Sequence, residues 1–216
     1  AAQENPSFAD PEINPSLPNV LLIGDSISIG YMLDARRALA GQANVFRPPT
    51  NCGPTTRGLD QIDKWLEGRR WDVIHFNFGL HDLKYMGPKG RNLADPGAPD
   101  SHKQVPIDQY AANIKTLAER LKQTGAKIIW RETTPVPEGA KGRVPGDSAK
   151  YNAAAAKVIE SIGGIETDPF FAFAESISEQ QRAKNVHYTR EGSRLLGEHV
   201  AAVIMKALPK RDQPAK

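Results

Sequence analysis

Short apolar runs alternate along the chain with longer stretches in which apolar residues recur every three or four positions. The runs predict five buried strands, at residues 20–23, 44–47, 71–78, 127–134 and 165–167. The periodic stretches predict helices over about 29–40, from Thr55 or Thr56 to about 66, over 107–124, from Asp147 or Ser148 to about 162, and over 189–208. An irregular stretch with a short helix is expected between the last strand and the last helix.

Strands that alternate with helices predict repeated βα units, which build a parallel sheet covered by helices on both faces. Five such strands predict an α/β fold, a flavodoxin-like three-layer α/β/α sandwich with a five-stranded parallel sheet. Residues 1–18 contain four prolines and little periodicity, so we expect an extended N-terminal arm. Residues 19–208 then form a single domain, and residues 209–216 form a C-terminal tail.

Composition excludes several classes of protein. The 216 residues carry a formal net charge of +3, and no basic stripe interleaved with aromatic residues indicates a nucleic-acid partner. No apolar run is long enough to cross a bilayer, so no membrane association is expected. The single cysteine, Cys52, excludes an internal disulfide and a thiolate-rich metal site. The chain starts with Ala-Ala-Gln, which fits a signal-peptidase product, so we expect a secreted or periplasmic protein.

Four chemically capable groups follow the predicted strands or precede the last helix. Ser26 follows the first strand within Gly-Asp-Ser, Gly53 follows the second, His81 follows the third, and His187 lies just before the final helix. The carboxyl ends of parallel strands share one edge of the sheet, where α/β proteins bind ligands, so one site can contain all four. Each alone also fits an ordinary turn, cap or loop residue.

The order of these groups resembles the SGNH (GDSL-like) hydrolase superfamily over about residues 20–204. Gly24-Asp25-Ser26 is similar to its first block, Gly53 to its second, Gly79-x-His81-Asp82 to its third, and His187 to its last. The resemblance implies esterase chemistry without a metal or other cofactor. It also implies that Ser26 is the nucleophile and His187 the general base.

The same resemblance assigns an oxyanion hole to the backbone N–H groups of Ser26 and Gly53 and to the side chain of His81. Asp25 and Asp82 are expected to hold their turns in shape rather than to transfer protons. The family has asparagine where this chain has His81, but a neutral imidazole still offers one N–H donor. Protonation of that imidazole would strengthen the donation.

The last block departs further from the family, which has aspartate three residues before the histidine. Lys184 stands at that position and cannot orient or stabilise an imidazolium as a carboxylate does. A backbone carbonyl near residue 184, a distant acid, or a two-residue dyad are the alternatives. Glu132 and Glu191 are candidate acids, and the sequence selects neither.

Two polar loops, 84–106 and 135–147, indicate the class of substrate. They are expected to overhang the strand ends, as substrate-binding loops do. They are poor in large aliphatic residues, whereas a lipase cleft is more apolar. We therefore expect a small-molecule or polysaccharide ester as substrate, with short acyl groups, acetyl in particular, on a carbohydrate. An O-acyltransferase on the same scaffold and a catalytically weak glycan-binding relative are the alternatives.

Overall fold

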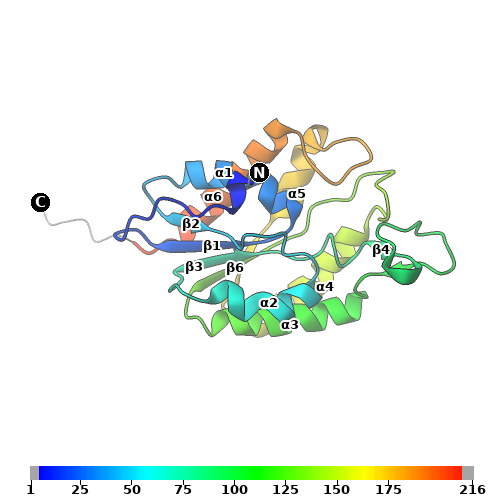
Figure 1. Ribbon diagram of the computed structural model, residues 1–216, viewed down its shortest axis with the longest axis horizontal. Helices are drawn as coiled ribbons and strands as arrows, with labels where there is room; N and C mark the ends of the chain where they lie inside the picture. The colour runs from blue at the N-terminus through cyan, green and yellow to red at the C-terminus, as the bar shows by residue number, and fades with distance from the viewer. Residues whose placement is uncertain (1–4, 211–216) are drawn as a thin grey trace, which may run out of the picture.

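A five-stranded parallel sheet lies between two layers of helices in the computed structural model, which describes residues 5–210 (Figure 1). The strands are β1 (Asn19–Ile23), β2 (Asn44–Phe46), β3 (Val73–Phe76), β6 (Lys127–Arg131) and β7 (Glu166–Asp168). They are ordered β2-β1-β3-β6-β7 and all pair in parallel. This is the flavodoxin-like order, so the predicted fold class is confirmed.

The central strands of the sheet are buried because helices cover both of its faces. The helices are α1 (Ser26–Ala38), α2 (Thr55–Leu66), α3 (Ile107–Lys122), α4 (Asp147–Ile162), α5 (Phe170–Ser176) and α6 (Arg190–Ala207). Figure 1 shows α1, α5 and α6 on one face and α2, α3 and α4 on the other. Side chains alternate between the two faces along each strand, which places Leu21 toward α2 and Leu22 toward α1.

The starts of α1, α2 and α4 differ from the sequence prediction. At α2 and α4, long-range contacts engage an expected capping residue, Thr55 and Asp147 respectively. Helix α1 starts at Ser26, three residues early, because the Asp25 carboxylate accepts the N–H of Ile27 and caps it. Thr55 does not cap α2, since its hydroxyl donates to Asp82 instead. Asp147 and Ser148 lie inside α4, whose N-cap is Gly146.

Asp147 forms an ion pair with Lys103, which belongs to the first of the two long loops. That loop contains a small antiparallel hairpin of β4 (Tyr85–Met86) and β5 (His102–Lys103). The N–H of Tyr85 donates to the carbonyl of Gly142 at 2.7 Å, so the two polar loops contact each other beyond the strand ends. The two loops are thus linked by a hydrogen bond beside the edge where the parallel strands end.

The N-terminal arm packs on the domain along its described part. It contains a 3-10 helix at Pro6–Phe8, and the Ser7 hydroxyl donates to the carbonyl of Ile29 in α1. Further along, the N–H of Asn14 donates to the side chain of Asn44 in β2. Residues 1–4 of the predicted arm and 211–216 of the predicted tail lie outside the described residues.

A buried polar cluster ties the last strand to the last helix. Asp168 is 0% exposed and accepts hydrogen bonds from His75 at 2.9 Å and His199 at 2.7 Å. Burial would raise its pKa, but these two hydrogen bonds outweigh burial and hold the pKa at about 2. Beside it on β6, the fully buried Arg131 guanidinium lies over the ring of Phe170, 4.3 Å from its centroid.

Replacing Asp168 by asparagine is expected to lower the free energy of unfolding by about 3 kcal/mol at pH 7. The amide presents a donor to one of the two histidine N–H groups and removes a charge that stabilises the fold above about pH 4, the ordinary carboxyl pKa. Urea denaturation of Asp168→Asn and of Asp60→Asn, an exposed site on α2, checks this. Equal unfolding midpoints for the two variants would contradict the expectation.

Candidate active site

Ser26 and His187 meet at the carboxyl edge of the sheet, although 161 residues separate them in sequence. Ser26 is the first residue of α1, directly after β1, and His187 lies three residues before α6. The Ser26 Oγ and His187 Nε2 atoms are 2.8 Å apart. The two helices pack closely because Gly197 has no side chain, since a Cβ there would lie 2.8 Å from the Tyr31 carbonyl.

Asn185 completes this hydrogen-bonded chain, and the sequence analysis missed it. Its Oδ1 lies 2.7 Å from His187 Nδ1 and accepts the backbone N–H of His187 at 2.9 Å. A backbone N–H can only donate, so the atom that it contacts must be the amide oxygen. Nδ1 of His187 is therefore the protonated nitrogen, and Nε2 is free to accept the proton of Ser26.

The acids that the sequence offered do not contact His187. Glu132 accepts the N–H of Phe171, and Glu191 pairs with Arg194. Lys184 adopts a left-handed backbone conformation, with φ of 56°. The sequence did carry a signal for Asn185, because asparagine commonly bonds the backbone N–H two residues ahead. That signal lies at a spacing of two residues, whereas the family's acid lies at three.

Gly53 lies beside the turn that carries Ser26. The N–H of Cys52 donates to the carbonyl of Gly24 at 3.2 Å, and Gly53 itself has φ of +66°. The N–H of Gly53 donates to Asn51 Oδ1 at 3.0 Å, so the predicted oxyanion donor already has an internal partner. The thiol of Cys52 is fully buried, and burial raises its pKa to about 11.

His81 is held neutral near the Ser26–His187 pair. Burial, the positive charges of Lys84 and Arg143, and the neighbouring His187 lower its pKa to about 4, although Asp25 opposes them. Lys84 Nζ lies 3.4 Å from His81 Nδ1. An ammonium can only donate, so this contact makes Nδ1 the acceptor and leaves the proton on Nε2.

Asp82 joins the Gly53 loop to the His81 loop. Its carboxylate is fully buried and accepts the Thr55 N–H at 2.9 Å and the Thr55 hydroxyl at 2.5 Å. The side chain of Asn113 in α3 donates to the same hydroxyl at 2.9 Å. Burial raises the pKa of Asp82 to about 7. Asp25 likewise shapes its own turn, as the cap of α1.

A cavity of about 170 Å³ opens next to the Ser26–His187 pair. Ile27, Gly30 and Tyr188 contribute to its walls, together with the cationic Arg182. Among residues 5–210, no group of three or more histidine, cysteine, aspartate or glutamate side chains is arranged to hold a metal ion. In the same part of the chain, no helix has both the length and the apolar character needed to cross a membrane.

Comparison with known families agrees with this geometry. The model of the GDSL-like lipase/acylhydrolase family matches residues 22–195. The chain belongs to this family. The matched segment contains Ser26, Gly53, His81, Asn185 and His187, and membership makes the chain a carboxylic ester hydrolase. No curated protein sequence matches it.

Several solved structures share the fold at low sequence identity. The acetyl xylan esterase AlAXEase has a TM-score of 0.66 and 14% identity, over 86% of this chain and 99% of its own. The lipase/acylhydrolase from Enterococcus faecalis has a TM-score of 0.69 and 18% identity, over 91% and 100%. Axe2, an acetylxylan esterase from Geobacillus stearothermophilus, has a TM-score of 0.66 and 15% identity, over 88% and 93%. At these identities the likeness shows the fold alone.

His187 is expected to titrate below its ordinary pKa near 6.5, because burial and the positive charges of Arg143 and Arg182 outweigh the attraction of Asp25. NMR titration of the imidazole resonances measures this directly. Asn185→Asp, which places a carboxylate against Nδ1–H, should move the titration to higher pH. Gln123→Glu, at the end of α3, adds the same charge far from the site and serves as control. Identical midpoints in all three proteins would exclude the Asn185–His187 contact.

Proposed function

We propose that this acylhydrolase is a serine esterase that removes short acyl groups, acetyl in particular, from carbohydrate hydroxyls. The chain of hydrogen bonds from Ser26 through His187 to Asn185 carries the proposal. It links a nucleophile, a base and a group that orients the base, which is the arrangement that acyl transfer by serine requires.

In the first half-reaction, His187 Nε2 takes the Ser26 hydroxyl proton while Oγ attacks the ester carbonyl carbon. The tetrahedral intermediate collapses, the bond to the alcohol breaks, and His187 returns the proton to the leaving alcohol oxygen. In the second half-reaction, water loses its proton to His187, attacks the acyl-enzyme, and releases the carboxylic acid and Ser26. Asn185 holds Nδ1–H in place through both steps.

A neutral amide in place of a carboxylate changes the energetics of the base. Asn185 fixes the tautomer of His187 that can accept the Ser26 proton. In serine proteases in which asparagine replaces the triad aspartate, the large loss of kcat is attributed to the wrong histidine tautomer. It does not neutralise the imidazolium that forms during attack. Asp25 supports that charge from a distance, since its carboxylate raises the pKa of His187.

The oxyanion is proposed to bind the N–H groups of Ser26 and Gly53 and the Nε2–H of His81. Ser26 lies in the first turn of α1, where N–H groups lack partners within the helix and the helix dipole favours negative charge. The Gly53 N–H would exchange Asn51 for the oxyanion, because a charged oxygen is a stronger acceptor than an amide oxygen. His81 would donate as a neutral imidazole.

Support for a short acyl group comes from the size of the cavity beside Ser26. At about 170 Å³, it is smaller than the roughly 300–1,000 Å³ of typical small-molecule pockets. Support for a carbohydrate comes from the polar loops joined above the site, and two structural neighbours are named as acetyl xylan esterases. Their titles describe those proteins, and the extension to this chain is our proposal.

Ser26→Ala is expected to lower kcat/KM for 4-nitrophenyl acetate by about 10⁴-fold or more, because no other group forms the acyl-enzyme. The wild type should prefer acetate to octanoate by at least about tenfold. Spectrophotometric assays of 4-nitrophenol release check both, with Ser161→Ala, an exposed serine in α4, as control. Activity that survives in Ser26→Ala would refute the mechanism. Acetyl transfer to an added sugar without hydrolysis would identify an acyltransferase.

Lys84→Met is expected to lower kcat for 4-nitrophenyl acetate about tenfold with little change in KM, because His81 then loses the donor that keeps its proton on Nε2. In a His81→Asn background the same substitution should have little effect, since an amide has no tautomers. A double-mutant cycle measures this coupling. Equal losses in both backgrounds would assign Lys84 a structural role only.

A further inference from the structure

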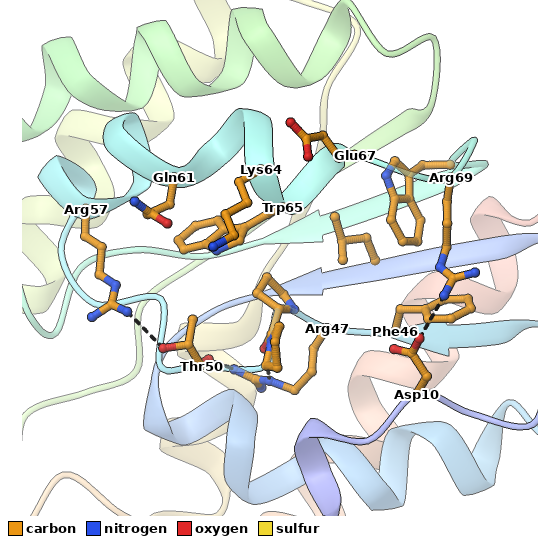
Figure 2. A pocket seen from close by; sticks show the side chains of 14 residues that line it. Asp10, Phe46, Arg47, Thr50, Arg57, Gln61, Lys64, Trp65, Glu67 and Arg69 are labelled. Carbon is orange, nitrogen blue, oxygen red and sulfur yellow. Dashed lines mark hydrogen bonds and ion pairs between the residues drawn. The ribbon is translucent and has the colours of Figure 1, made fainter.

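A second and larger cavity, of about 340 Å³, lies between helix α2 and strands β1 and β2 (Figure 2). We call it the α2 cavity. Apolar side chains form much of its wall, among them Leu21, Phe46, Trp65 and Trp71. Its size and mixed lining are those of a small-ligand site. Neither Ser26 nor His187 lines it, so it is separate from the cavity at the catalytic pair.

A stripe of polar side chains from α2 borders the α2 cavity. Arg57, Gln61 and Lys64 are four and three residues apart, which places them on one face of the helix. Figure 2 shows all three extending from α2, with Lys64 alongside Trp65. The stripe offers two cations and an amide, which are donors suited to an anionic group and to neighbouring hydroxyls.

The charges around the α2 cavity differ in how far they are already paired. Arg47 donates to four oxygens of the protein and has little capacity left. Arg69 is paired with Asp10 at 2.8 Å. Arg57 gives one nitrogen to the Thr50 hydroxyl at 2.9 Å, and Lys64 has no ion pair or side-chain hydrogen bond within residues 5–210.

The only other lining acid in the described chain is Glu67, and Figure 2 shows its carboxylate pointing away from Arg69. Because Asp10 is already paired with Arg69 and the Arg47 donors are used within the protein, the lining cations with free donors are Arg57 and Lys64. An acidic ligand in the cavity would therefore find two cations along one face of the same helix. Arginine and lysine beside apolar surface are suited to carboxylate and sulfate groups.

The wall of the α2 cavity is continuous with the catalytic edge. Pro49 and Thr50 line the cavity, and Gly53 follows three residues later in the same loop. A Cβ on Gly53 would lie 3.2 Å from Arg57 Cδ, so the Arg57 stem packs directly against this glycine. An extended molecule can thus reach from one side of the loop to the other.

We infer that the α2 cavity binds an acidic sugar unit of the substrate, with its carboxylate or sulfate toward Arg57 and Lys64. The inference deepens the proposed function and rests on it: the ester is carried by an acidic saccharide, and this cavity holds a unit beside the acylated one. The apolar wall receives the C–H face of the sugar, and Gln61 bonds its hydroxyls. A neutral saccharide would leave the two cations without a partner.

Calorimetric titration of the Ser26→Ala protein tests the inference without turnover. Tetragalacturonate, a sulfated carrageenan tetrasaccharide and neutral xylotetraose are compared at about 50 mM NaCl, where screening is weak. At least one acidic probe should bind about tenfold more tightly than xylotetraose. Its affinity should fall about fivefold or more with Lys64→Gln. The better of the two acidic probes identifies the anion.

Lys115→Gln, at an exposed position on α3, removes the same charge elsewhere and should leave the affinity unchanged. Unfolding temperatures of the variants confirm that each is folded. Equal affinity for acidic and neutral probes, or an affinity insensitive to Lys64→Gln, would overturn the inference. Hydrolysis of 4-nitrophenyl acetate by the protein with native Ser26 tests the proposed function separately, because that small ester does not reach the α2 cavity.

Discussion

One buried guanidinium holds the catalytic edge of the sheet together. Arg47, only 4% exposed at the end of β2, donates to the carbonyls of Gly24 and Thr50 and to the Ser28 hydroxyl. These contacts join the turn before Ser26, the first turn of α1 and the loop that carries Gly53. Burial lowers the pKa of Arg47, yet the group remains charged at any physiological pH. The geometry of the Ser26 turn and of the Gly53 loop therefore depends on one shared set of hydrogen bonds.

The order of layers and strands could be predicted because apolar periodicity records which residues face the core. The starts of α2 and α4 could not, because they depend on contacts between residues distant in sequence. Thr55 is a good local cap, but Asp82 takes its hydroxyl from 27 positions away. Asp147 is likewise drawn to Lys103. A local pattern records propensity, and tertiary hydrogen bonds decide between propensities of similar size.

The site could be located from the order of Ser26, Gly53, His81 and His187, because parallel strands bring their ends to one edge. Asn185, which contacts Nδ1 of His187, could not be predicted. The family has an acid three residues before the histidine, whereas this chain has a neutral amide two residues before it, in an Asx turn. Lys84 belongs to a polar loop, and nothing in the neighbouring sequence indicates that its ammonium group contacts the imidazole of His81. Such roles depend on orientation, which composition and spacing do not encode.

The separation of 161 residues between Ser26 and His187 has a consequence for how the protein matures. Ser26 belongs to the first βα unit of the chain, whereas His187 directly precedes the last helix. Contacts this distant in sequence form late, after the intervening loop-closure entropy has been overcome. A chain that ends before residue 187 therefore contains Ser26 without the histidine that contacts it in the complete fold. The Ser26–His187 contact joins the two ends of the domain, so its formation marks the completion of the whole fold.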